Sequence, residues 1–492
     1  MRRLGAVTLS IAIAIVASAH IGSPNVVFDG SAGVYPVRVI VRPPEVVPGL
    51  AEVIVRAGAQ DVERVSIRPV FWRTGASGAP AGDEMQHVTG QDRVYTGRLW
   101  LMAYGAYSVY VTVSGARGSG TVIVPVNSLA TGRLALSPAL SAILVVLGAL
   151  LVAGLLSIVR AAAGESLVPP GEAFDATKRR RANVVTATGA AVLALAIFGG
   201  AKWWKSEDGN YQRRIYGSPA ADPTISVDAA HRTLRLVVHD TARFQAIYSP
   251  VAPDHGKMMH LFLVRLPEMD AFAHLHPVQS DSLVFNTEIP ALPAGHYRLF
   301  GDLTLENGLS LTVTNTIELP EMKGAVAPSD SDDAWALSPS VVRIAPGAVA
   351  TLGNAYTMAW AGDSTSLVAN GTTDLRFVVR DAKGAVAQLQ PYLGMAAHAV
   401  VLRDDESVFI HLHPMGTVAA ISQRVFALRD LGDTTSNGRL RSDSLAATMP
   451  AMSMSGALTF PYEFPKPGRY RIWVQVRPER QVLTGTFDVN VR

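Results

Sequence analysis

Apolar and polar residues alternate in short runs along most of this chain. Examples are Val37–Val41, Val65–Arg68 and Ser108–Val113, with Gly, Pro and Asp between the runs. Alternation with a period of two buries one face of a strand, and many short strands at close spacing favour antiparallel sandwiches. The pattern returns after the middle of the chain, and a polar stretch from Ala325 to Asp333 interrupts it. We therefore predict a mainly β protein.

Two longer apolar stretches depart from this pattern, at Leu136–Val159 and Ala182–Ala201. Both lack charged residues and reach the roughly 20 residues that a helix needs to cross hydrocarbon. Lys178–Arg181 lie in the loop between them, and an excess of Lys and Arg marks the cytoplasmic side. Trp203 and Trp204 follow the second stretch, as is typical of a membrane interface. We predict a transmembrane hairpin; the alternative is a helical hairpin in a soluble core.

The N-terminus has the pattern of a secretory signal. Met1-Arg2-Arg3 precedes an apolar run to Val16, and Ala17-Ser-Ala19 forms a small-residue cleavage site. The run is short for a bilayer span, so we predict cleavage after Ala19, with an uncleaved anchor as the alternative. Both interpretations place the following domain outside the cytoplasm.

A repeated Gly-x-Tyr motif supports a division into related domains. It reads Gly105-Ala-Tyr107, Gly295-His-Tyr297 and Gly468-Arg-Tyr470, each followed by alternating apolar residues. The motif fits the tyrosine corner of immunoglobulin-like sandwiches, where the phenol bonds back to the backbone. We expect these tyrosines to be structural.

The predicted fold class is three immunoglobulin-like antiparallel β-sandwich domains plus a two-helix transmembrane hairpin. The predicted location is a cytoplasmic (inner) membrane of bacterial type, with the N- and C-terminal domains in the periplasm. The expected parts are a signal peptide (1–19), a first sandwich (20–130), two helices (134–160 and 182–202) around a cytoplasmic loop (161–181), a second sandwich (216–322), a linker (323–339) and a third sandwich (340–492, with an insertion at 415–459).

Composition narrows the chemistry. The 492 residues include no cysteine, so disulfides, thiolate metal sites and cysteine nucleophiles are excluded. The net charge is only +3, and the sequence has no basic face interleaved with aromatic residues. Both features argue against nucleic acid as a partner. A metal would have to be held by His, Met, Asp or Glu.

Two histidine hairpins are the most distinctive feature. The second predicted sandwich has His260, a strand, a turn and then Phe-x-His274-Leu-His276-Pro; the third has His398, a strand, a turn and then Phe-x-His411-Leu-His413-Pro. Side chains alternate along a strand, so the two histidines of each His-Leu-His share one face. Folding each hairpin about its turn sets His260 opposite His276, His398 opposite His413, and Val400 opposite His411. Directly opposed Cβ atoms lie about 5 Å apart, so each trio can converge on one ion.

The same faces carry Phe262, Val264 and Phe272, or Val400, Leu402 and Phe409. We therefore expect the histidines to point inward, near one end of each sandwich. Buried neutral imidazoles need hydrogen-bond partners or a metal. The alternative to a metal site is that they cap the core through hydrogen bonds to the backbone and to tyrosine.

Methionines near both hairpins add thioether donors. The candidates are Met258, Met395 and Met415, together with Met449 and Met452 in the insertion. Thioether plus imidazole without thiolate suits copper, and zinc is the second candidate metal. The alternative is that these methionines fill gaps in the packing.

The segment Asp254-His-Gly-Lys-Met-Met-His260 through His274-Leu-His276-Pro277 resembles the YtkA-like extracytoplasmic domain family. Gln390-Pro-Tyr-Leu-Gly-Met395 with His411-Leu-His413-Pro414 resembles a diverged copy. The His/Met arrangement is also similar to periplasmic copper carriers of the CopC group. The likeness extends over 234–319 and 375–491 at the level of motifs. It implies an extracytoplasmic sandwich that handles copper.

We predict a membrane-anchored metal-binding protein that buffers copper or exchanges it with a partner protein of the envelope. The alternative is a non-enzymatic scaffold of immunoglobulin-like domains with structural histidines. An enzyme with an open His₃ metal site is the third hypothesis. We expect no enzyme, because the sequence has no HExxH, no phosphate loop and no Ser-His-Asp motif.

Overall fold

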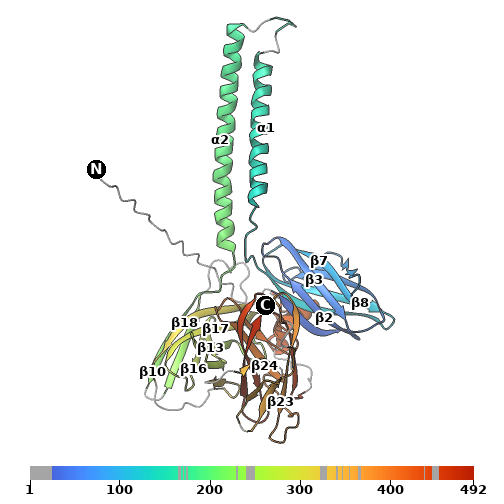
Figure 1. Cartoon of the computed structure of the whole chain (residues 1–492), viewed down its shortest axis with the longest axis vertical. Helices are drawn as coiled ribbons and strands as arrows, with labels where there is room; N and C mark the ends of the chain where they lie inside the picture. The colour runs from blue at the N-terminus through green and yellow to red at the C-terminus, as the bar shows by residue number, and fades with distance from the viewer. Residues whose placement is uncertain are drawn as a thin grey trace, which may run out of the picture. The chain divides into compact units, whose positions relative to one another are not determined.

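The protein is mainly β, with two long apolar helices, as predicted (Figure 1). The computed structural model describes residues 25–164, 168–169, 171–172, 175–228, 231–239, 250–321, 330–338, 342–345, 347–353, 355–363, 367–436, 438–445 and 454–492. The predicted signal peptide, Met449 and Met452 lie outside these ranges. Among the described residues the strands form six sheets, with antiparallel pairing except where β20 runs parallel to β28. The sheets enclose three separate hydrophobic cores, so we describe them as three sheet pairs.

The first sheet pair packs alternate apolar residues such as Val39, Val53 and Val109 between its two sheets. One sheet has the order β1 (Val26–Ala32), β2 (Tyr35–Arg42), β3 (Gly49–Ala57), β7 (Val94–Leu101) and β6 (Gln86–His87). The other has the order β5 (Asp83–Glu84), β4 (Val62–Phe71), β8 (Gly105–Gly115) and β9 (Gly118–Ser128), and a short 3₁₀ turn occupies Ala76–Gly78.

The second sheet pair carries the first histidine hairpin. Its smaller sheet has the order β10 (Ala221–Asp228), β11 (His231–Val238), β16 (Val284–Glu288) and β15 (Val278–Asp281). Its larger sheet has the order β12 (Val251–Ala252), β17 (Gly295–Leu305), β13 (His260–Arg265), β14 (Ala271–Leu275) and β19 (Ala334–Leu337), with β18 (Ser310–Leu319) also paired to β17. β19 lies in the predicted linker, which is therefore not a simple connection. Its apolar residues, Ala334 to Leu337, add a strand beside β14.

The third sheet pair carries the second histidine hairpin. One sheet has the order β20 (Val342–Arg343), β28 (Leu483–Val491), β27 (Gly468–Val476), β24 (Ala397–Arg403) and β25 (Phe409–Leu412). The other has the order β21 (Val349–Thr351), β22 (Thr357–Trp360), β23 (Thr372–Arg380) and β26 (Ala457–Glu463). The predicted insertion contains helices α3 (Ala420–Asp430) and α4 (Ser442–Leu445).

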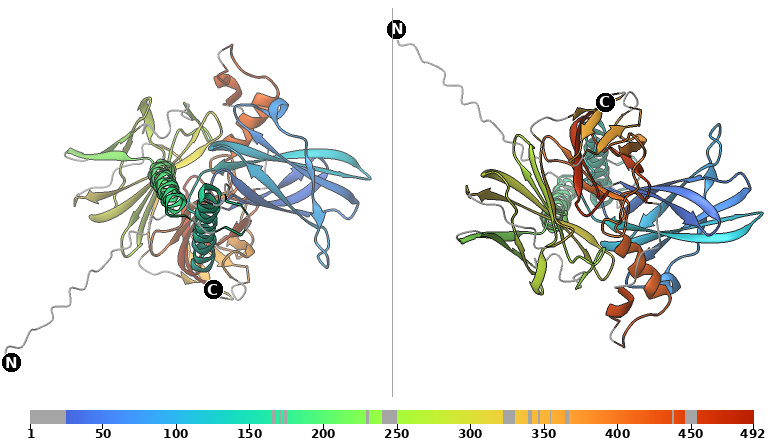
Figure 2. Two further views of the ribbon diagram at one scale, coloured as in Figure 1. Left: turned by 90° about the horizontal axis from the view of Figure 1, so that it is seen from above. Right: turned by 90° about the horizontal axis from the view of Figure 1, so that it is seen from below.

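The insertion joins the sheet pairs to one another. Ile421, Val425 and Phe426 of α3 belong to the core of the second sheet pair, and Val418 belongs to that of the first. A partly buried ion pair adds a link between the first and third sheet pairs: Arg42 donates to Glu463, whose side chain is fully buried, at 2.9 Å. In the views from above and below, the yellow-green strands of the second pair lie beside the orange-red strands of the third (Figure 2).

All three predicted tyrosine corners form hydrogen bonds with the backbone four residues upstream. Tyr297 donates to the carbonyl of Pro293 at 2.9 Å, and Tyr470 donates to that of Lys466 at 2.6 Å. In the first sheet pair the Tyr107 hydroxyl accepts from the amide of Ala103 at 3.2 Å. The predicted hydrogen bonds between these tyrosines and the backbone are confirmed.

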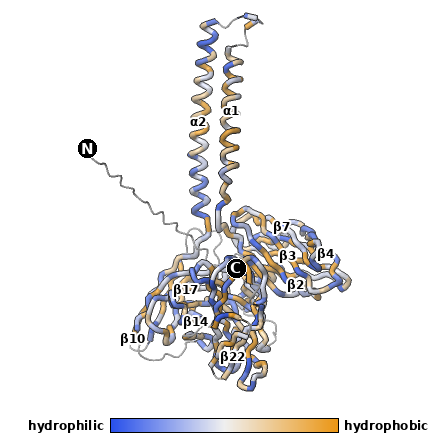
Figure 3. Tube along the Cα trace, in the orientation of Figure 1, coloured by the Kyte–Doolittle hydropathy of each residue, from blue (hydrophilic) through white to orange (hydrophobic). Residues whose placement is uncertain are grey.

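The two long helices are α1 (Pro138–Gly164) and α2 (Ala176–Arg214), and both are long and apolar enough to cross a membrane by length and composition. The carboxylate of Asp175 caps α2 by accepting from the amide of Lys178 at 2.7 Å. Apolar side chains such as Leu144 and Leu195 are exposed. Figure 3 shows hydrophobic positions, in orange, along both helices. Residues 130–215 form one compact unit, and the sheet pairs form the other.

Candidate metal centre

The two hairpins adopt the register that the sequence predicts. In the second sheet pair Phe262 faces His274, and in the third Val400 faces His411. Continuing each ladder by two residues on the same face brings His260 opposite His276, and His398 opposite His413. Each hairpin therefore presents its three histidines on one face, because strand side chains alternate.

That face does not point into the core of its own sheet pair, which corrects the expected inward orientation. Leu261, Leu263 and Leu275, on the opposite face, line the core of the second sheet pair. The histidine-bearing faces of the two sheet pairs meet instead, around an interface cluster of apolar residues. Its members are Phe262, Val264, Met269, Phe272, Phe300, Val400, Leu402, Phe409 and Trp473. Alternation fixes which residues share a face, but both faces of these strands are apolar, so it does not choose between core and interface.

The interface has an approximate twofold arrangement that follows the sequence repeat. Phe300 stacks on Phe409 with ring centroids 4.1 Å apart, and Trp473 stacks on Phe272 at 4.9 Å. Phe300 and Trp473 occupy the same position after the Gly-x-Tyr motif, and Phe272 and Phe409 the same position before His-Leu-His. The two hairpins thus face each other across equivalent aromatic contacts.

Seven imidazoles gather next to this interface in one buried histidine cluster. Six are the predicted residues and the seventh is His255. His411 lies 5.1 Å from His260 and 5.3 Å from His398, measured between ring centroids, so it connects the two hairpins. The side chain of His255 is fully buried and stands 5.4 Å from His398 and 5.2 Å from His413.

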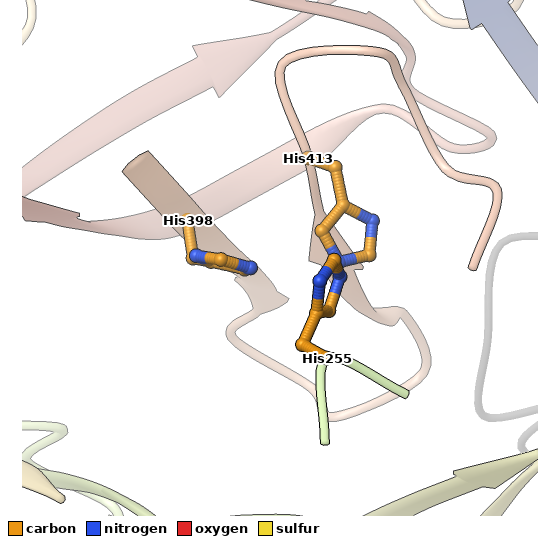
Figure 4. A group of neighbouring side chains, drawn as sticks. All are labelled: His255, His398 and His413. Atoms are coloured by element: carbon orange, nitrogen blue, oxygen red, sulfur yellow. The ribbon is translucent and has the colours of Figure 1, made fainter. Parts of the chain in front are cut away.

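The ligand nitrogens form two groups in which all atoms lie within 4.8 Å of one another. The His260 group (His260, His274, His276) is the first predicted trio. The His255 group (His255, His398, His413) differs from the second predicted trio, because His255 of the other sheet pair stands where we expected His411. Figure 4 shows these three rings directed toward one another from three separate segments of the chain.

A repeated tight turn in the sequence could have drawn attention to His255, although the spacing of the histidine hairpins does not. His255 occupies the turn Asp254-His-Gly-Lys257, in which His255 and Gly256 have φ of 52° and 80°. The third sheet pair repeats the turn as Tyr392-Leu-Gly-Met395, with Leu393 at φ 52°. Aligning the two turns shows that His255 replaces the leucine found at position 393. The alignment does not show that His255 lies next to His398.

Hydrogen bonds orient the His260 group. His276 Nδ1 lies 3.0 Å from the buried carboxylate of Asp333, and His274 Nδ1 lies 2.8 Å from Gln475 Oε1 and 3.0 Å from the Tyr392 hydroxyl. In both rings these contacts engage Nδ1, so that Nε2 points away from the hydrogen-bond partner. Histidines that bind a metal are commonly oriented by such a contact on the nitrogen that does not bind the ion. His274 Nε2 stands 3.1 Å from His260 Nδ1.

The His255 group lacks such support. Both ring nitrogens of His255 and of His398 are buried without a hydrogen-bond partner among the described residues. His255 Nε2 is 3.7 Å from the nearer carboxylate oxygen of Asp254, beyond hydrogen-bond distance. Buried polar groups are almost always paired, so four such nitrogens side by side do not fit a purely structural role.

Burial also keeps five of these rings uncharged, because it lowers their pKa values. It lowers the pKa of His260, His274, His398 and His411 well below the usual value, and the neighbouring imidazoles lower it further. Burial lowers the pKa of His413 to about 4. Neutral imidazole is the form that binds metal ions.

The donors fit an imidazole-bound transition metal. With metal–nitrogen bonds of about 2.0–2.1 Å, two ligand nitrogens of a tetrahedral ion lie about 3.3 Å apart. The 3.1 Å between His260 Nδ1 and His274 Nε2 is close to this spacing, and the ligand nitrogens within each group lie no more than 4.8 Å apart.

The predicted methionine ligands occupy packing positions. Met258 packs against the core of the second sheet pair and Met415 against that of the first. Met395 is fully buried and its backbone pairs with Tyr392. Their thioethers as copper ligands stay a prediction, and so do those of Met449 and Met452.

Comparison with known proteins adds little about function. Residues 225–321 and 350–492 match a family model described as a domain of unknown function, DUF8832. These segments correspond to the second and third sheet pairs and contain all seven residues of the histidine cluster. No curated protein matches the chain.

Solved structures give weak likenesses. An engineered protein is 19% identical over 18% of this chain and 19% of its own, with a TM-score of 0.15. A tandem repeat from the extending region of a large adhesion protein is 9% identical over 90% of this chain and 71% of its own, with a TM-score of 0.16. A Corynebacterium diphtheriae protein described as membrane anchored is 8% identical over 95% and 96%, with a TM-score of 0.16. These scores are too low to bear on architecture or function.

Proposed function

We propose that this protein is a membrane-anchored metal-binding protein of the bacterial-type cell envelope, and that it binds copper outside the cytoplasm. The observation that carries the proposal is the histidine cluster, above all His255 and His398, whose ring nitrogens have no hydrogen-bond partner among the described residues. Removing such nitrogens from water costs free energy that a bound metal would recover. No step of catalysis is part of the proposal.

Copper is the preferred ion because the cluster offers imidazole donors in a chain without thiolates. Among common divalent ions Cu²⁺ binds nitrogen ligands most tightly, and zinc is the next candidate. The resemblance of 254–277 to YtkA-like domains, and of the His/Met arrangement to the CopC group, supports the same choice. Nearby methionines would stabilise Cu(I) if any of their sulfurs reached the cluster.

The anchor is proposed from α1 and α2. The basic residues Lys178–Arg181 favour a cytoplasmic end for the hairpin, so the sheet pairs would face the periplasm. We further propose that each sheet pair is an immunoglobulin-like sandwich. The three tyrosine corners support this assignment, since that hydrogen bond is a hallmark of the fold.

The competing function is a scaffold in which the histidines are structural. The hydrogen bonds of His274 and His276 to Gln475 and Asp333 are compatible with it. It gives no reason for burying His398 with both nitrogens unpaired. The contact of His276 with Asp333 is also the one expected of a ring that presents its other nitrogen to a metal, and His276 Nε2 is buried without a partner among the described residues.

The test is the metal content of the full-length protein in detergent after incubation with CuCl₂ and removal of unbound ion. We expect retained copper in the wild type and less copper in His398→Ala, in which the affinity of the altered site falls by more than the 10–100-fold typical of removing an outer-shell partner. The matched control is His296→Ala, because the His296 side chain is 61% exposed and lies outside the cluster. Wild-type protein that retains neither copper nor zinc would refute the proposal.

A further inference from the structure

The seven imidazoles of the histidine cluster exceed the number of ligands that one metal ion coordinates. A tetrahedral site takes four ligands, and a histidine site with an open position takes three. The histidine cluster instead resolves into the His260 group and the His255 group, which share no residue. His411 belongs to neither and lies between them.

We propose that the cluster is a two-ion site, with one metal ion on His260, His274 and His276 and a second on His255, His398 and His413. This inference rests on the proposed function and adds the number and the ligands of the ions. His411 is placed to complete the coordination of either ion, since its Nε2 is buried without a partner among the described residues.

The two groups differ in how they are held, which supports two sites rather than one large one. The His260 group is oriented by Asp333, Gln475 and Tyr392. In the His255 group, His255 and His398 have no such hydrogen bonds among the described residues. The His260 group is therefore pre-organised by hydrogen bonds, whereas His255 and His398 are held by packing alone.

Two buried dications also need negative charge nearby, and the structure provides carboxylates at both groups. Asp333 contacts His276 at 3.0 Å, and Asp254 is 3.7 Å from His255 Nε2. Asp302 stands 3.9 Å from Nδ1 of His411, between the groups. The carbonyl of Asp254 lies 3.3 Å from His260 Nε2, which links the two groups through the backbone.

Each group depends on both sheet pairs. The His255 group takes one ligand from the second pair and two from the third. The His260 group lies wholly on the second pair, but Gln475 and Tyr392 of the third hold His274. Metal loading would thus fasten the second and third sheet pairs together.

The repeat itself supplies the test variant. Leu393 occupies the position of His255 in the equivalent turn, with the same φ of 52°. His255→Leu therefore removes a ligand with a residue that this turn accepts. His276→Ala removes a ligand of the other group, and His296→Ala is the exposed control.

The experiment measures copper per chain in full-length protein in detergent, titrated with CuCl₂ and freed of unbound ion. We expect two ions in the wild type and in His296→Ala, and one in His255→Leu and in His276→Ala. Electron paramagnetic resonance of the wild type should show two coupled Cu(II) spins, and each single variant an uncoupled signal. This readout on the unmodified protein does not depend on how the variants fold.

A single ion in the wild type, or loss of all copper from either variant, would overturn the two-ion site while leaving copper binding intact. No retained copper or zinc in the wild type would remove the proposed function together with this inference. The three outcomes are distinguishable in one titration.

Discussion

Imidazoles in water titrate near pH 6.5, but five of those in the histidine cluster are held neutral by burial and by neighbouring imidazoles. The pKa of His413 is about 4 in the folded protein, mainly because of burial. His260, His274, His398 and His411 shift in the same direction. The unfolded chain therefore binds protons that the folded chain does not bind until lower pH.

We predict that metal-free protein loses stability as the pH falls through this window. A lowered pKa in the folded state means that the stabilisation is complete above about 6.5 and is lost as the pH falls towards 4. His413 alone should lower the free energy of unfolding by about 2 kcal/mol between pH 7 and pH 5. Denaturant unfolding after chelation measures this, with His296→Ala expected to keep the same pH dependence. An unfolding midpoint that stays constant over this range would contradict the assignment.

At the scale of elements, the tyrosine corners fix the chain where each long central strand begins. Tyr470 is fully buried and donates to the Lys466 carbonyl at 2.6 Å, just outside β27. This position is far along the strand from Gln475, which contacts the histidine cluster. Stability and metal binding can therefore be separated within one strand.

We predict that Tyr470→Phe lowers the free energy of unfolding by about 1–2 kcal/mol, because it leaves a carbonyl without its donor. Copper content should stay at the wild-type value. Tyr356→Phe is the control, since its hydroxyl makes only an exposed contact with Glu479 and should change stability by less than about 0.5 kcal/mol. Chemical denaturation of the wild type, Tyr470→Phe and Tyr356→Phe measures these free energies of unfolding. Equal unfolding midpoints in all three would refute the structural role of Tyr470.

At the scale of the whole molecule, the proposed topology can be tested cleanly because the chain has no cysteine. Leu431, in the insertion of the third sheet pair, is 81% exposed, and Glu172 is exposed in the loop between α1 and α2. We predict that Leu431→Cys reacts with a membrane-impermeant maleimide in intact spheroplasts, whereas Glu172→Cys reacts only after permeabilisation. Gel-shift labelling measures both, and the reverse pattern would invert the topology.

Local sequence patterns by themselves determined the strands, the two apolar helices, the tyrosine hydrogen bonds and the hairpin register. All of these follow from local rules: side chains alternate along a strand, and a turn fixes which residues oppose each other. For that reason His260, His274 and His276 could be placed on one face, as could His398, His411 and His413. Only the tertiary structure decided that these faces meet across the interface cluster rather than in separate cores. It also brought His255 to His398 and His413, because contacts between distant sheets depend on packing that no local pattern encodes.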